Sequence, residues 1–121
     1  MKLKFIFLVY LLQTLSINVF AQESDVKTLI RSPLLGNCIT CHQFPGEAGK
    51  QGNFAPSLIG VGKKYNLDQL KQWISDARVL NPNTLMPPFG SINGLSQPMV
   101  NQPVLTIEQI NKIALELKTY N

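Results

Sequence analysis

Two cysteines and one histidine, in the run Cys38-Ile39-Thr40-Cys41-His42, are the residues of this 121-residue chain whose types and spacing dictate chemistry. On one helical turn, positions i, i+3 and i+4 share a face, so both thiols and the imidazole can reach one cofactor. A Cys-X-X-Cys-His run is the attachment signature of c-type haem, in which the two thiols bond the porphyrin and the histidine ligates its iron. The sequence therefore predicts one covalently attached haem c.

Three other uses of two cysteines at this spacing make different demands. A plain disulfide and a thioredoxin-like redox pair need no adjacent histidine, and the redox pair needs a βαβ context that the sequence lacks. A structural zinc site needs four ligands, whereas the chain has two cysteines and one histidine. A small exported module with a Cys38–Cys41 disulfide is the main alternative to haem.

A second iron ligand would come from the thioether of Met86 or Met99, from a lysine or from water, because His42 is the one histidine of the chain. Met86 precedes Pro87-Pro88, and these prolines fix backbone φ and lower the entropy of holding a thioether in place. Met99 follows only Pro98. These features favour Met86 as the distal ligand, with Met99 as its competitor.

A ligating histidine ordinarily has its other ring nitrogen held by a backbone carbonyl. Pro56 is the candidate for this support of His42, and the alternative is a proline that only shapes a turn. Six apolar residues would suit a porphyrin lining but are equally well explained as ordinary core, so none is assigned individually: Phe44, Phe54, Leu58, Tyr65, Trp73 and Phe89.

The elements that must position these residues are short helices separated by Pro- and Gly-rich stretches, which predicts an all-α domain with long loops. Helices are expected from Ser24 to about Arg31, from the cap Asn66 to about Val79, and from Thr106 onward. The remaining segments are expected to be loops, and 81–102 is too long to be an idle connection. The apolar stripe expected on the last helix consists of Ile107, Ile110, Ile113, Ala114, Leu117 and Tyr120.

The N-terminus has the pattern of a secretion signal. Lys2 and Lys4 precede an apolar run, and Val19-Phe20-Ala21 offers the small residues that a signal peptidase recognises. Residues 1–21 are therefore expected to be cleaved during export to the periplasm, which leaves a cytochrome domain at 22–121; the alternative is an uncleaved membrane anchor.

Two of the 11 basic residues and none of the 7 acidic residues lie in the signal, so the net charge of the mature chain is +2. No nucleic-acid partner is expected at so small a charge.

With these residues in place, the sequence resembles class I cytochromes c, and within them the SoxX family of small monohaem subunits of SoxAX cytochromes. The resemblance covers nearly the whole mature chain and rests on blocks 36–47, 56–62 and 81–90. The third block, Asn-Pro-Asn-Thr-Leu-Met-Pro-Pro-Phe-Gly, points most narrowly to this family. The resemblance implies thioether attachment at Cys38 and Cys41, proximal ligation by His42, distal ligation by Met86, and support of the proximal histidine by the block around Pro56.

The resemblance also implies a function. A SoxAX-type complex is an L-cysteine S-thiosulfotransferase that oxidatively conjugates thiosulfate to a cysteine of a SoxYZ-type carrier protein. This chain would accept electrons from a SoxA-type partner in a heterodimer and pass them to a downstream acceptor. Once haem has used its cysteines and histidine, none remains for nucleophilic or acid–base work, so no catalytic residue is expected here.

Two other cytochrome functions remain open at this point: a free-standing diffusible electron carrier, and a cytochrome domain that serves another enzyme. The chain also departs from the family at two places. Ala55 and Ser57 stand where relatives tend to have Gly and Pro, and the segment 91–103 looks longer than the usual step into the last helix.

Overall fold

The computed structural model describes residues 25–95 and 101–121, and these residues form helices and loops with no strand. The all-α class expected from the sequence is confirmed, whereas the expected signal at 1–21 lies outside the described residues. No helix within these two ranges is both long and apolar enough to cross a membrane. The elements are α2 (Val26–Arg31), the 3-10 turn η1 (Cys38–Thr40), α3 (Val61–Lys64), α4 (Leu67–Asp76), its 3-10 extension η2 (Ala77–Val79) and α5 (Ile107–Lys118).

The two longest helices, α4 and α5, begin with the same reciprocal pair of hydrogen bonds. The side chain of Asn66 accepts from the Gln69 amide at 2.9 Å, and the Gln69 side chain accepts from the Asn66 amide at 2.9 Å. Thr106 and Gln109 form the equivalent pair at the start of α5. Each pair satisfies amides that lack a partner within the first helical turn, so both predicted helix starts are confirmed.

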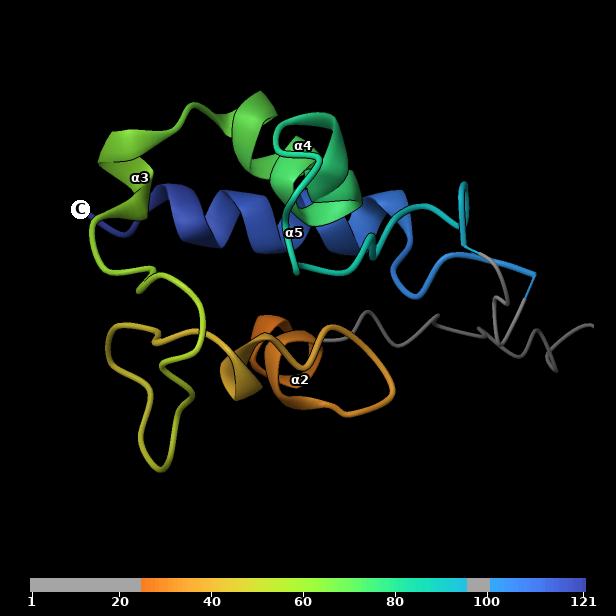
Figure 1. Ribbon diagram of the computed structural model, residues 1–121. Helices are drawn as coiled ribbons and strands as arrows, with labels where there is room; N and C mark the ends of the chain where they lie inside the picture. The colour runs from red at the N-terminus through yellow and green to blue at the C-terminus, as the bar shows by residue number, and fades with distance from the viewer. Residues whose placement is uncertain (1–24, 96–100) are drawn as a thin grey trace, which may run out of the picture.

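The hydrophobic core lies on both sides of α5, which packs against α4 and α2 (Figure 1). Ile107, expected in the apolar stripe of α5, is 61% exposed, so the stripe was wrong at its first position. Because Cα–Cβ bonds tilt toward the helix N-terminus, the side chain of the first helical residue projects beyond the packed turns. The buried residues of the core cluster are Leu29, Ile30, Phe44, Val61, Leu70, Ile74, Leu105, Ile110, Ile113, Ala114 and Leu117.

Helix α3 forms where the sequence predicted loop. Gly62 in α3 donates its amide to the carbonyl oxygen of Tyr120 at 2.8 Å, and a Cβ at this position would overlap the backbone of Lys118. Lys118 Nζ in turn donates to the carbonyl oxygens of Gly62 at 2.6 Å and Tyr65 at 3.1 Å. The end of α5 therefore holds α3 through contacts far apart in sequence, which a local pattern cannot predict.

Candidate haem-attachment site

Cys38, Cys41 and His42 lie on a single tight turn. The amides of Cys41 and His42 both donate to the carbonyl oxygen of Cys38, at 3.1 and 2.9 Å. The second bond spans i to i+4 as in an α-helix, so the backbone provides the turn on which positions i, i+3 and i+4 share a face. The turn begins after Asn37, which adopts a left-handed conformation with φ of 44°.

The loop that follows wraps back over this turn. Its amides bind the carbonyl oxygens of the turn in three places, Gly52 to Ile39 at 2.8 Å, Ala55 to Cys41 at 3.0 Å and Leu58 to Gln43 at 2.9 Å. At position 52 a Cβ would overlap the carbonyl group of Thr40, so the approach requires glycine. The Gly-rich composition of this segment predicted a loop, but the sequence did not indicate which glycine allows the close approach.

The ring of His42 is held by the residue proposed for that role. Its Nδ1 lies 2.7 Å from the carbonyl oxygen of Pro56. A carbonyl oxygen can only accept, so Nδ1 is the donor of this bond, and in the neutral ring the lone pair is then on Nε2. The ring is thus oriented through one nitrogen and available for a metal through the other.

Both thiols are free and half-buried. Burial raises the pKa of Cys38 to about 11, since removal from water disfavours the thiolate, and the neighbouring Cys41 adds a smaller effect in the same direction. Gly36 leaves room for this thiol, because a Cβ at position 36 would lie 2.9 Å from Cys38 Sγ. Cys38 is therefore a neutral thiol at physiological pH.

The donor set fits a c-type haem. Two thiols and one imidazole sit on the same turn, and the hydrogen bond from His42 to Pro56 leaves Nε2 as the nitrogen that would face iron. Cys38 and Cys41 would hold the porphyrin covalently, and a neutral thiol carries the hydrogen that addition to a vinyl group requires.

The segment with Met86 is anchored between α4 and the approach to α5. Met86 is half-buried, and its amide donates to Thr84 Oγ1 at 3.1 Å. Further along, the Gly90 amide donates to the carbonyl oxygen of Ser75 at 2.9 Å. A Cβ at position 90 would lie 2.6 Å from both Ser75 Oγ and the Ile110 side chain, so this crossing also requires glycine. Met99, the competing thioether, lies outside the described residues.

A second anchor on this segment was missed by the sequence. Arg78 Nη2 donates to the carbonyl oxygen of Asn93 at 2.7 Å and to Asp76 Oδ2 at 2.6 Å, while its Nε donates to Asp76 Oδ1 at 2.8 Å. Hydrogen bonds from Arg78 lower the pKa of Asp76, and the carboxylate in turn raises the pKa of Arg78. Partners separated by two residues belong to no helical charge pattern, so the sequence carried no signal for this pair.

The apolar residues considered for a porphyrin lining divide into different environments. Phe44 is buried in the core, where its ring stands edge-on to Tyr120 at 6.3 Å between centroids. Tyr65 and Trp73 form a tilted pair at 6.0 Å. Phe54 is 72% exposed. Leu58, Tyr65 and Phe89 are partly buried and pack against the core cluster.

Further polar contacts join the loop at 44–51 to α2. The Glu47 carboxylate pairs with Arg31, which also donates to the carbonyl oxygen of Ala48 at 3.0 Å. Gln51 accepts from the Phe44 amide and donates to the carbonyl oxygen of Glu47 at 2.8 Å. These contacts close the tip of the loop beside the attachment turn. Glu47 ends the block 36–47 of the family resemblance, but the sequence did not indicate its pairing with Arg31 or the role of Gln51.

Comparison with known proteins supports the same fold. No family model and no curated protein matches the sequence. Among solved structures, the chain is similar to SoxXA from P. pantotrophus, with a TM-score of 0.73 and 26% identity over 78% of each chain. Equal coverage of the two chains means that they are of similar length. The helical architecture matches the cytochrome c fold of that protein. The chain therefore has the cytochrome c fold that its sequence motifs predicted, and its similarity to SoxXA is consistent with the resemblance to the SoxX family.

Proposed function

We propose that this protein is a periplasmic monohaem cytochrome that transfers electrons as the small subunit of a SoxAX-type complex. Haem c would be attached at Cys38 and Cys41, with His42 and Met86 as iron ligands. The observation that carries the proposal is the attachment turn, in which Pro56 fixes Nδ1 of His42 and leaves Nε2 free. The likeness to SoxXA, in a chain of similar length, supports the subunit role.

A bound haem supplies a one-electron couple. The residues of this chain set its surroundings. The Pro56 carbonyl orients the ring of His42 and increases the basicity of Nε2. The thioether of Met86 is a soft, neutral ligand, and such a ligand favours ferrous iron and a higher reduction potential. An electron would enter and leave without any bond of the polypeptide being made or broken.

The division of labour in the complex follows from the chemistry of the substrate. Joining thiosulfate to a carrier thiol forms one sulfur–sulfur bond and releases two electrons and one proton. This chain would take up one electron at a time and pass it to a downstream acceptor. It has no cysteine or histidine beyond those assigned to haem, so we assign the conjugating site to a SoxA-type partner and the thiol to a SoxYZ-type carrier.

Production in a host that exports and attaches haem tests the first part of this proposal. We expect an intact mass increased by one haem, a Soret absorption band and loss of residues 1–21. The double variant Cys38→Ala/Cys41→Ala should lack the added mass and accumulate poorly, because about a hundred residues with long loops bury little core without the porphyrin. Exported protein without the added mass would leave the disulfide-bonded module as the explanation.

The sulfur role needs a separate measurement. The haem-loaded chain should co-purify with a SoxA-type cytochrome, and its iron should become reduced when thiosulfate and a SoxYZ-type carrier are added to the pair. A monomer whose iron is indifferent to thiosulfate in the presence of both proteins would instead support the free-standing carrier.

A further inference from the structure

The stretch from Val79 to Ile107 contains no Asp, Glu, Lys, Arg or His. Its described part, residues 79–95 and 101–107, is about a quarter of the described chain but holds most of the exposed large apolar side chains. These six are Val79, Leu80, Leu85, Leu95, Val104 and Ile107. The other four in the described ranges are scattered, at Leu34, Phe54, Ile59 and Leu115. We call the surface of residues 79–95 and 101–107 the neutral face.

The neutral face is held in place by the rest of the fold. The Gly90 amide binds the Ser75 carbonyl, and the Leu105 amide donates to the carbonyl oxygen of Phe89 at 2.9 Å, which joins the two described parts of the face. Both parts lie toward the N-terminal end of α5, in teal and light blue in Figure 1. A preorganised surface loses little conformational entropy when a partner covers it.

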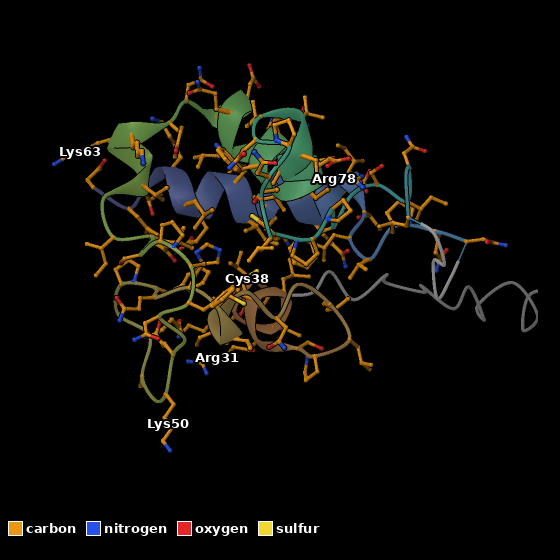
Figure 2. The ribbon with its side chains drawn as sticks, in the orientation of Figure 1. Arg31, Cys38, Lys50, Lys63 and Arg78 are labelled. Carbon is orange, nitrogen blue, oxygen red and sulfur yellow. The ribbon has the colours of Figure 1, made fainter. Side chains whose placement is uncertain are left out.

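Charged residues border this face but do not lie within it. Arg78 at one border is paired with Asp76, and the exposed Glu108 follows Ile107 at the other border. Lys50 and Lys63 point into solvent on the opposite side of the view from Arg78 (Figure 2), and no carboxylate of the described residues pairs with either lysine. Steering of a short-lived partner would use such lysines, whereas a charge-free apolar surface suits a partner that stays bound.

We infer that the neutral face is the permanent docking surface for the larger, haem-bearing subunit of the complex, which must present an uncharged apolar surface of its own. The inference rests on the proposed function and names its partner surface. A charged partner surface would lose water here without gaining a counter-charge. Met86 lies within the same stretch, so this docking would place the partner beside the proposed distal ligand, whereas a second copy of the chain would cover the face without supplying an electron donor.

The test uses the haem-loaded chain and the purified SoxA-type subunit of the same organism, with affinity measured in low and in high salt. Leu85→Glu and Val79→Glu change side chains that are 78% and 68% exposed, so both variants should fold. Val79 lies seven residues from Met86 and its variant should keep the haem spectrum; because Leu85 precedes Met86, the spectrum of Leu85→Glu is recorded first, and Val79→Glu decides the test if that spectrum changes. Leu34→Glu, at 88% exposure outside the neutral face, is the matched control. The double variant Lys50→Glu/Lys63→Glu tests the opposite, charged surface.

We expect a one-to-one complex whose affinity is insensitive to salt. Leu85→Glu and Val79→Glu should each weaken it about 100-fold or more, because each would bury an unpaired carboxylate in the interface. Leu34→Glu and the double lysine variant should bind like the wild type. Wild-type binding by both neutral-face variants, or loss of binding in the double lysine variant, would overturn the inference while leaving the proposed complex intact.

Two further outcomes would also overturn it. Self-association of the wild-type chain that Leu85→Glu abolishes would assign the face to a second copy, and sedimentation with phosphatidylglycerol vesicles that Leu85→Glu abolishes would assign it to a lipid surface. Failure of the proposed function itself is distinguishable, because the wild-type chain would then lack haem or fail to bind the SoxA-type subunit at any salt concentration.

Discussion

The amide of Gly52 donates to the carbonyl oxygen of Ile39 across 2.8 Å, and this bond closes the following loop onto the turn that holds both cysteines. Thr40 lies so near that no side chain fits between the two backbones. The turn is thus held on one side by backbone hydrogen bonds, and its geometry depends on a residue without a Cβ.

Gly52→Ala should destabilise the haem-loaded protein by about 1–3 kcal/mol or more, because the added methyl group must push the loop away from Thr40. Urea unfolding followed by circular dichroism measures the change. Asn53→Ala, at the exposed neighbouring position, is the control and should stay within about 0.5 kcal/mol of the wild type. Equal free energies of unfolding for Gly52→Ala and Asn53→Ala would contradict the prediction, because the loop would then move away from Thr40 without loss of stability.

Met86→Ala should abolish the sulfur-to-iron charge-transfer band of the oxidised protein, because the variant removes the proposed thioether ligand. Met99→Ala is its matched control and should retain the band. Absorption spectra of the two exported, haem-loaded variants decide between the thioethers. The reverse pattern would transfer the distal role to Met99.

Asp76→Asn should lower the free energy of unfolding near neutral pH but not in acid. Hydrogen bonds from Arg78 lower the pKa of Asp76 in the folded chain below its ordinary value of 3.8, so the carboxylate stabilises the fold above that value. This contribution is lost as pH falls through the lowered pKa. Unfolding by urea between pH 7 and pH 2.5 should therefore show the wild type and Asp76→Asn converging below pH 3.8.

Asp68→Asn is the control for that experiment. Asp68 is 95% exposed and lies 3.9 Å from Lys71, a surface pair of the kind that contributes little at any pH. A difference between wild type and Asp76→Asn that stays constant down to the lowest pH would contradict a role for the ionised carboxylate.

The free energy of unfolding of the wild type should fall at high pH through the ionisation of Tyr120, and Tyr120→Phe should lack this fall. Burial raises the pKa of Tyr120 to about 12 from its ordinary value of 10.0, with a smaller effect from Glu116. The unfolded chain therefore loses the phenolic proton first, and the wild type should lose stability relative to Tyr120→Phe as pH rises from 10 to 12. Thermal unfolding of both proteins through this range measures the difference. Parallel curves would contradict the raised pKa.

The parts of the fold that the sequence predicted depend on neighbours along the chain. The capping pairs Asn66–Gln69 and Thr106–Gln109 span three residues, and both are formed. The turn at 38–42 likewise follows from local spacing. Helix α2, expected from Ser24 to about Arg31, runs from Val26 to Arg31 and buries Leu29 and Ile30.

The parts that the sequence did not predict depend on contacts between distant residues. Helix α3 relies on Gly62 meeting Lys118, and the Met86 segment relies on Arg78 reaching Asn93. Ile107 is exposed because it is the first residue of α5, where the helical period alone does not determine whether other segments cover the side chain. The roles of the site residues toward haem and iron stay predictions, since the structure supplies their arrangement only.

The partial burial of Cys38 has a consequence for how the protein would mature. The thiol is half-buried once the loop at 52–58 has bonded to the turn, whereas it is open to solvent in the unfolded polypeptide. If haem is attached there as proposed, we expect attachment to precede closure of this loop, because a modifying enzyme reaches an exposed sulfur more easily than a sheltered one. Folding and haem attachment would then compete in time.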